Sequence, residues 1–310
     1  MKGYAMYSIP ENFSRQMIEM YDDAGVAWLE QLPDLIDDCA RRWSLRVLAP
    51  YTLSFNYVAP AIRADGTPVV FKAGMHQDTK TEIDALRHFA GHGMVRMLEA
   101  DRERGAFVLE RLAPGESLVS MQDDERATAI AAEVMLELWR GPASAPPADH
   151  TFPTVADWIA GMRRMRQHFG GSTGPLPRAL VEQAESLFAE LLASQAAPVL
   201  LHGDLHHDNI LSAERAPWLA IDPKGVIGEP AYEVGAWLRN WLPDLLERPD
   251  PARVMARRVD QLAEALGIDR ARIRGWGLAQ AMLSVWWCIE DGGSGWEPTI
   301  ACAELLAGIK

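Results

Sequence analysis

The sequence predicts an α+β protein built from two lobes. Short segments rich in β-branched and aromatic residues gather between residues 45 and 112, whereas helical periodicity dominates from residue 113 to residue 310. A further stretch with helical spacing, residues 11–44, precedes the strands. A chain of 310 residues is long enough for two sizeable cores. We therefore expect an N-terminal lobe of helices and an antiparallel sheet, residues 1–112, followed by a mostly helical C-terminal lobe, residues 113–310.

Composition narrows the functional classes. A formal net charge of -13 disfavours nonspecific binding to nucleic acids or anionic membranes and suits a small cationic substrate. The three cysteines, at positions 39, 288 and 302, show no pairing or metal spacing, which indicates a reducing compartment. The N-terminal residues lack the apolar core of a signal peptide, and no apolar run approaches the roughly eighteen residues of a membrane span. We expect a cytoplasmic protein, and the sequence does not indicate its oligomeric state.

The N-terminal lobe is expected to begin with helices that Gly25 interrupts and Pro33 bends or restarts. Three strands should then follow, and after them a helix and a hairpin of two further strands. The expected strands are 47–48, 51–58, 68–72, 95–99 and 106–110, with the helix at 81–89. In the second lobe, helical spacing predicts helices at 123–139, 158–169, 177–193, 251–266, 270–290 and 298–308.

The residues best suited to chemistry lie between Val199 and Gly225. A buried strand, 199–201, runs into the polar cluster HGDLHHDN, and a second apolar run ends at Asp222. Two acids and an amide should therefore converge at one edge. Phosphoryl transfer needs one carboxylate to receive the hydroxyl proton and oxygen ligands to hold Mg²⁺ against the phosphates. Asp204 fits the base, and Asn209 and Asp222 fit the Mg²⁺ ligands.

This cluster has two other interpretations. Three histidines and three carboxylates in a short span could form a transition-metal site, but no histidine follows His207 and the spacing matches no standard zinc pattern. The cluster could also be a purely structural polar loop. His202 follows an apolar strand, which favours a buried orienting residue over a metal ligand.

Lys72 is the second informative residue. It closes a short apolar strand, where a cation needs an anionic partner, and Glu82 lies ten residues further on in a predicted helix. A lysine that simply reaches solvent from the strand end is the alternative. No Gly-Lys pair occurs in the chain, which excludes a Walker A loop, and no glycine-rich G-x-G-x-x-G loop is present either.

The motifs HGDLHHDN and IDPKG resemble those of the aminoglycoside phosphotransferases, in particular their streptomycin 6-phosphotransferase and hydroxyurea phosphotransferase branch. The resemblance implies a protein-kinase-like fold and an ATP- and Mg²⁺-dependent O-phosphotransferase. The implied acceptor is a hydroxyl of a small cationic molecule such as streptomycin, and the implied role is antibiotic resistance. A kinase acting on hydroxyurea or another metabolite, and a nucleotide-binding relative without catalysis, remain as alternatives. The presence of Lys72 with Asp204, Asn209 and Asp222 counts against the latter.

The resemblance also suggests further site residues. Lys72 and Glu82 resemble the strand lysine and helix glutamate that position the nucleotide phosphates in kinases. Other nucleotide contacts would come from Ser54 and Asn56, in a hairpin turn that covers the phosphates, and from the backbone near Glu110 and Leu112, at the adenine-binding hinge. Ser54 and Asn56 fit an ordinary half-buried strand equally well.

Three residues near the second motif are candidates for substrate contact. Lys224, two residues after Asp222, would either contact the transferred phosphate or cover the turn in which it lies. Glu229 and Glu233 stand where related sequences commonly carry aspartate, and they either cap a helix or face a cationic acceptor.

Overall fold

The computed structural model describes residue 7 and residues 9–75, 77–140, 145–146, 151–242 and 244–309. The chain divides into two compact units. The N-terminal unit comprises Met1–Gly91 and Val95–Ala113, and the C-terminal unit comprises His92–Met94 and Pro114–Lys310.

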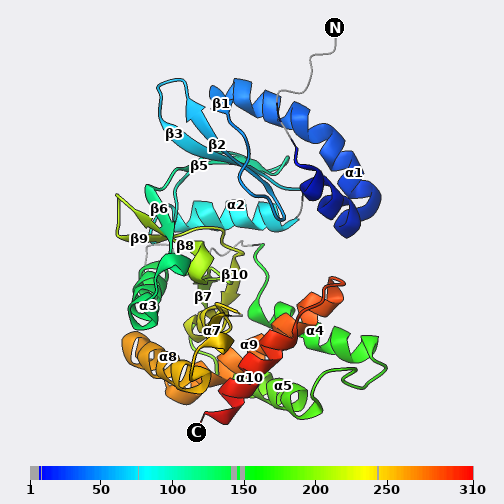
Figure 1. The fold of residues 1–310 in the computed structure, drawn as a ribbon, viewed down its shortest axis with the longest axis vertical. Coiled ribbons are helices and arrows are strands. Elements are labelled where there is room, and N and C mark those ends of the chain that lie inside the picture. Colours follow the sequence, from blue (N-terminus) through cyan, green and yellow to red (C-terminus); the bar gives the residue numbers. More distant parts are fainter. Residues whose placement is uncertain are drawn as a thin grey trace. The chain divides into compact units, whose positions relative to one another are not determined.

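The N-terminal unit is built on a five-stranded antiparallel sheet of order β1-β2-β3-β5-β4 (Figure 1). Alternate side chains of β2 and β3 are buried in a core that they share with the first helix, α1 (Glu11–Arg42). The helix α2 (Gln77–Phe89) follows β3. The strands are β1 (Leu45–Val47), β2 (Tyr57–Arg63), β3 (Pro68–Ala73), β4 (Met97–Asp101) and β5 (Ala106–Glu110). The expected antiparallel sheet and its hairpin at 95–110 are therefore confirmed.

The strand predicted at 51–58 is wrong for most of its length. The chain makes bends over residues 52–56, and β2 begins only at Tyr57. Apolar residues do alternate here, but Tyr51 and Phe55 are 43% and 52% exposed, so the alternation does not mark a buried face. The segment is the connection of the hairpin formed by β1 and β2.

The first helix, α1 (Glu11–Arg42), is kinked at Asp22, where φ is 47° and ψ is -131°. The sequence places the interruption at Gly25, three residues later, and the helix continues through Pro33. The role of Gly25 is steric, because a Cβ there would lie 2.3 Å from the carbonyl oxygen of Met17. The glycine thus permits the close approach of the two segments on either side of the kink.

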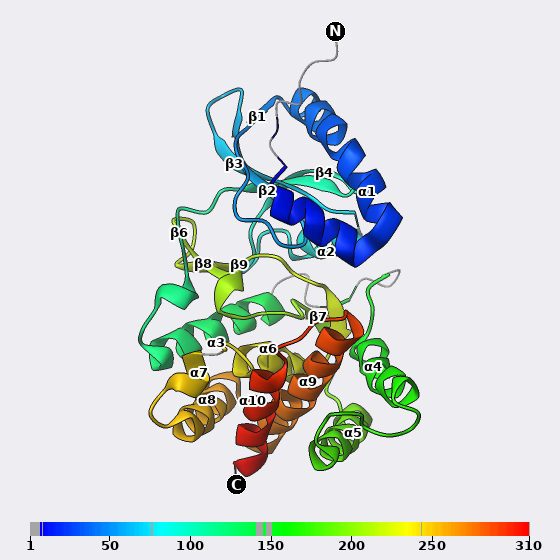
Figure 2. The ribbon, with the colours of Figure 1, turned by 45° about the vertical axis from the view of Figure 1, so that its right-hand side comes forward.

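The C-terminal unit is mostly helical, and all six helices predicted there are present with ends shifted by a few residues. Figure 2 shows α9 and α10 side by side in this unit. No helix of the described residues is long and apolar enough to cross a membrane. The helices are α3 (Asp124–Arg140), α4 (Val155–His168), α5 (Arg178–Ala193), α6 (Val234–Leu238), α7 (Asp244–Glu247), α8 (Pro251–Leu266), α9 (Arg270–Glu290) and α10 (Glu297–Gly308).

Two small antiparallel sheets in this unit hold the polar segments between their strands. One pairs β7 with β10, and the other has the order β6-β8-β9. The polar cluster predicted from the sequence connects β7 to β8, and Asp222 follows β9. The strands are β6 (Pro114–Ser117), β7 (Val199–Leu201), β8 (Ile210–Ala213), β9 (Trp218–Ala220) and β10 (Val226–Gly228).

Candidate active site

The loop from His202 to Asn209, called the HGD loop below, is fixed at its start by a buried carboxylate. Glu233 is fully buried and accepts hydrogen bonds from the backbone N–H groups of His202 (2.7 Å) and Gly203 (2.9 Å). Burial raises the pKa of Glu233 to about 7, although these N–H groups act in the opposite direction. The backbone immediately before Asp204 is thus held by a side chain thirty residues away in the sequence.

His202 ties the HGD loop to the segment that carries Asp222. Its Nε2 lies 2.7 Å from the carbonyl oxygen of Ile221, and its Nδ1 accepts a hydrogen bond from the N–H of Asp204 at 3.2 Å. Burial lowers the pKa of His202 to about 4, so the ring is neutral near pH 7 and donates from Nε2. The expectation that His202 is buried is confirmed.

The carboxylate of Asp204 is paired with a cation. Its Oδ1 accepts a hydrogen bond from Nη2 of Arg239 at 3.0 Å, and its Oδ2 lies 3.7 Å from Nε2 of His206. Burial alone would raise the pKa of Asp204, but the contact with His206 and the charge of Arg239 outweigh burial and hold that pKa well below its usual range. Asp204 is therefore ionised at neutral pH, while a quarter of its side chain remains exposed.

Asn209 and Asp222 lie at the ends of paired strand segments. The N–H of Ile221 donates to the carbonyl oxygen of Asn209 at 2.9 Å, so Asp222 directly follows a residue that is hydrogen-bonded to Asn209. Nδ2 of Asn209 donates to the carbonyl oxygen of Asp204 at 2.9 Å, so the amide oxygen Oδ1 is directed away from that contact. One carboxylate and one amide oxygen form a donor set suited to Mg²⁺, which keeps further positions for water and phosphate oxygens.

No group of three or more His, Cys, Asp or Glu side chains suited to a metal occurs within the residues that the structure describes. Asn209 and Asp222 do not form such a group, because they are two residues and one of them is an amide.

In the N-terminal unit, Lys72 and Glu82 form a buried ion pair. Nζ of Lys72 lies 2.8 Å from Oε1 of Glu82, and the two side chains are 3% and 8% exposed. The ammonium also lies 5.8 Å from the centre of the Phe107 ring, at cation–π distance. The alternative of a solvated lysine at the strand end is therefore excluded.

A sequence model of the aminoglycoside/hydroxyurea antibiotic resistance kinases matches residues 42–292. The chain belongs to this kinase family. A streptomycin 6-kinase of Streptomyces glaucescens is 33% identical over 98% of this chain and 98% of its own length. A hydroxyurea phosphotransferase of Kitasatospora aureofaciens is 32% identical over 98% of this chain and 87% of its own length. The chain is accordingly a phosphotransferase, as the two motifs indicate.

Solved structures show that the kinase has the expected protein-kinase-like fold. Choline kinase LicA from Streptococcus pneumoniae superposes with a TM-score of 0.62 at 14% identity, covering 90% of this chain and 99% of its own. The aminoglycoside phosphotransferase APH(4)-Ia, in a ternary complex with ADP and hygromycin B, gives a TM-score of 0.60 at 17% identity. That comparison covers 88% of this chain and 97% of the other.

The remaining candidates for nucleotide contact lie at two places in the N-terminal unit of the kinase. Ser54 is exposed and Asn56 is half-buried in the connection between β1 and β2. The side chain of Asn56 lies against Gly74, just beyond the end of β3. Glu110 ends β5 and both donates to and accepts from the backbone of Arg96, and half-buried Leu112 follows it.

The three candidates for substrate contact have different surroundings in the kinase. Lys224 is exposed, and its N–H donates to the carbonyl oxygen of His202 at 2.8 Å. Glu229 is buried and engaged by Arg272 at 2.7 Å and by Nε1 of Trp276. The carboxylates of Glu229 and Glu233 both bind groups inside the protein, so we do not propose that either of them contacts the acceptor.

Sequence reasoning missed Arg239. The residue lies in the run AWLRNW, and a charged side chain within an apolar run is the signal that could have drawn attention to it. Its contact with Asp204 depends on the packing of α6 against the HGD loop, which no local pattern reveals.

The last histidine of the HGD loop stacks on a buried tryptophan of the kinase. The rings of His207 and Trp237 lie 3.8 Å apart with an interplanar angle of 14°. Burial, followed by the charge of Arg258, lowers the pKa of His207 to about 3. This histidine is thus neutral in the folded kinase throughout the physiological pH range.

We expect His207→Phe to reduce the loss of stability on acidification, because phenylalanine keeps the stacking and removes the titration. The unfolded chain takes up a proton on His207 near pH 6.5, whereas the folded chain does so only near pH 3. Stability from this residue is therefore present at neutral pH and is lost as the pH falls below 6.5. The free energy of unfolding should be measured in urea at several pH values. Between pH 6 and pH 4, the difference between variant and wild type should shift in favour of the variant by up to about 1.4 kcal/mol per pH unit. Parallel stability curves for the two proteins would contradict the assignment.

Proposed function

We propose that the protein transfers the γ-phosphoryl group of ATP, with Mg²⁺, to a hydroxyl group of a small cationic acceptor, with streptomycin as the first candidate. The observation that carries the proposal is the ionised carboxylate of Asp204, which Arg239 holds on one oxygen, in a loop whose backbone is hydrogen-bonded to Asn209 and, through Asn209, to the residue before Asp222. Membership of the kinase family supports the reaction class.

In this proposal Asp204 receives the proton of the acceptor hydroxyl. Oδ1 accepts from the guanidinium of Arg239 at 3.0 Å, whereas Oδ2 lies 3.7 Å from Nε2 of His206, beyond hydrogen-bond distance. Oδ2 is therefore proposed as the oxygen that accepts the proton. Little covalent help is needed in phosphoryl transfer, and the work of the carboxylate is to orient the hydroxyl and to take its proton. The hydrogen bonds from His202 and Gly203 to Glu233 keep the backbone of the base in place.

Asn209 and Asp222 would hold Mg²⁺ through the amide oxygen and the carboxylate. Bound there, the ion would neutralise charge on the phosphate oxygens. The protein's own part is to fix the two ligands, and the hydrogen bonds of Nδ2 of Asn209 and the N–H of Ile221 do this.

Lys72 is proposed to hold the nucleotide phosphates, with Glu82 orienting its ammonium group. The ion pair is buried, which fixes the direction of the lysine far better than a solvated side chain would allow. Ser54 and Asn56 are proposed as further phosphate contacts, and the backbone at Glu110 and Leu112 as the contact for adenine. Lys224 is proposed to reach the transferred phosphate, because its side chain is exposed next to the segment of Asp222.

The acceptor class rests on the relatives and on charge. Two streptomycin 6-kinases are 33% and 34% identical over nearly the whole chain. The net charge of -13 favours the approach of a cation. Hydroxyurea is the second candidate, because a hydroxyurea phosphotransferase is 32% identical over a comparable length.

The direct test measures ADP release from ATP with streptomycin, with hydroxyurea and with no acceptor, each with Mg²⁺ and with excess EDTA. We expect Mg²⁺-dependent release that streptomycin stimulates, a phosphorylated product in mass spectra, and loss of both in Asp222→Ala. Stimulation by hydroxyurea alone would transfer the assignment to that acceptor. ATP binding without release under any condition would instead identify a nucleotide-binding protein without catalysis.

A further inference from the structure

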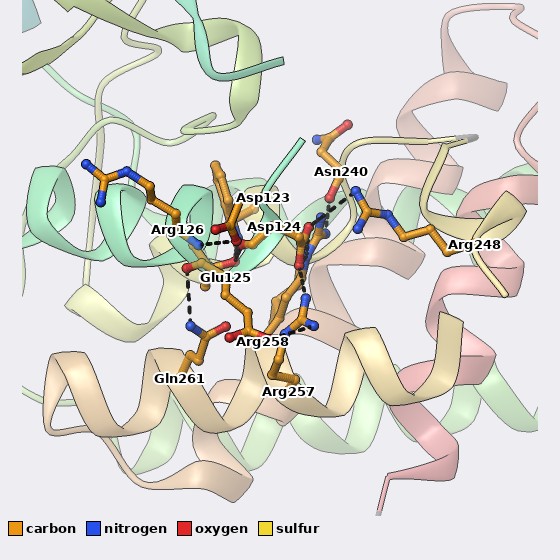
Figure 3. Close-up of polar contacts among 12 residues, drawn as sticks. Asp123, Asp124, Glu125, Arg126, Asn240, Arg248, Arg257, Arg258 and Gln261 are labelled. Carbon is orange, nitrogen blue, oxygen red and sulfur yellow. Dashed lines mark hydrogen bonds and ion pairs between the residues drawn. The ribbon is translucent and has the colours of Figure 1, made fainter. Parts of the chain in front are cut away.

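A buried ion pair at the start of α3 has no part in the chemistry proposed above. Asp124 accepts hydrogen bonds from Arg258 of α8, with Nε 3.1 Å and Nη2 2.5 Å from Oδ1. The two side chains are 4% and 2% exposed. Figure 3 shows Arg257 and Arg258 directed from α8 toward Asp124, and the same carboxylate is 2.5 Å from Arg257 and 4.0 Å from Arg248.

Stability alone is a poor explanation for this pair. Two charges that leave water lose solvation, and an apolar pair of the same volume is often equally stable or more so. A guanidinium does offer something that an apolar group lacks, namely several N–H donors in a fixed plane.

Arg258 reaches the segment that follows α6. Its Nη1 donates to the carbonyl oxygen of Asn240, and its guanidinium lies 5.9 Å from the centre of the Trp237 ring. Trp237 in turn stacks on His207 of the HGD loop. One buried side chain thus contacts two residues of a short segment, and one of these touches the loop of Asp204.

Arg239 lies between those two residues. Its backbone N–H donates to the carbonyl oxygen of Gly235, and its Nη2 donates to Oδ1 of Asp204 at 3.0 Å. Arg258 therefore holds the backbone directly after Arg239 and the side chain two residues before it. A shift of this segment would move the guanidinium of Arg239 away from Oδ1 of Asp204.

We propose that Asp124 and Arg258 form a positioning pair that holds Arg239 against Oδ1 of Asp204 and so leaves Oδ2 directed to the acceptor hydroxyl. The proposal rests on the proposed function, in which Asp204 receives the proton. Neither member of the pair contacts Asp204, and both act through Arg239.

A double-mutant cycle tests this coupling. Arg258→Lys keeps the buried charge but cannot maintain both the paired contact with Asp124 and the bond to Asn240. We expect it to lower kcat by about 10- to 100-fold, with KM for ATP and acceptor changed by less than about threefold. Arg239→Ala should lower kcat at least as much. The two together should be no slower than Arg239→Ala alone, because the effect of Arg258 passes through Arg239. Millimolar guanidinium chloride should partly restore Arg239→Ala and the double variant equally.

Arg257→Met is the matched control. Arg257 comes from the same helix and binds the same carboxylate, but its guanidinium contacts Asp124 and Glu125 rather than the segment that follows α6. We expect its kcat to stay within about twofold of the wild type. An equal loss of kcat in this control would overturn the proposal, because the effect would then belong to the charge cluster as a whole.

Independent, multiplying losses in Arg258→Lys and Arg239→Ala would also overturn it. The melting temperature of each variant should be measured beside its kinetics, to show that the variant is folded in the assay. If Arg258→Lys melts below the assay temperature, the double variant Asp124→Asn with Arg258→Gln takes its place, because it replaces the ion pair by two neutral amides. Absence of acceptor-stimulated turnover in the wild type would remove the proposed function together with this inference. Normal turnover in the wild type, together with losses of kcat that multiply in the double variant, would remove this inference and leave the proposed function intact.

Discussion

Asp204→Asn is expected to lower kcat by about 100- to 10,000-fold, the range typical for loss of a positioned general base. Asparagine keeps the shape of the side chain and can still accept from Arg239, but it cannot take a proton. ATP affinity, measured by titration calorimetry, should change by less than about threefold, because the proposed nucleotide contacts lie elsewhere. Steady-state kinetics with streptomycin or the acceptor found active would give kcat and KM separately.

The same loop provides the control for that measurement. Asp208 lies four residues after Asp204, and its side chain is 47% exposed and 3.7 Å from His206. Asp208→Asn removes an equal charge from the same loop and should leave kcat within about twofold. If both variants lose activity equally, the loop charge matters rather than the base. If Asp204→Asn retains most of its activity, Asp204 does not receive the proton.

The elements that the sequence predicted well are those defined over short distances along the chain. Asp204, Asn209 and Asp222 lie within nineteen residues. Asp204 and Asp222 come after apolar runs that mark strands, and Asn209 directly precedes one. Strand ends at a shared edge bring such residues together, so local pattern sufficed. The pair of Lys72 and Glu82 was predictable for a similar reason, because a lysine in an apolar strand requires a counter-ion.

The contacts that the sequence could not predict depend on how helices pack. Arg239 meets Asp204, 35 residues before it, and Arg258 meets Asp124, 134 residues before it. Helical periodicity indicates which face is buried but not which polar group on another helix it will meet. The prediction of a strand at 51–58 was wrong although it rested on a local pattern. Apolar residues do alternate there, but two of the aromatic ones face solvent.

Glu233→Ala is expected to impair both stability and catalysis. The substitution leaves the buried backbone N–H groups of His202 and Gly203 without an acceptor, and each unsatisfied buried donor costs about 1 to 3 kcal/mol. The free energy of unfolding, measured in urea, should therefore fall by about 2 to 6 kcal/mol. Because these N–H groups immediately precede Asp204, kcat should fall as well, by about 10- to 100-fold in the folded protein.

Glu229→Ala separates the two effects. Glu229 is also buried, four residues earlier in the chain, but its carboxylate is engaged by Arg272 and Trp276 and not by the HGD loop. Removal of this buried partner should lower stability by about 3 to 5 kcal/mol, since Arg272 loses its counter-ion. At a temperature where both variants are folded, only Glu233→Ala should show the fall in kcat. Equal kcat values for the two would mean that Glu233 supports the fold without positioning Asp204, and the orientation of the base would then have to come from His202 and Arg239.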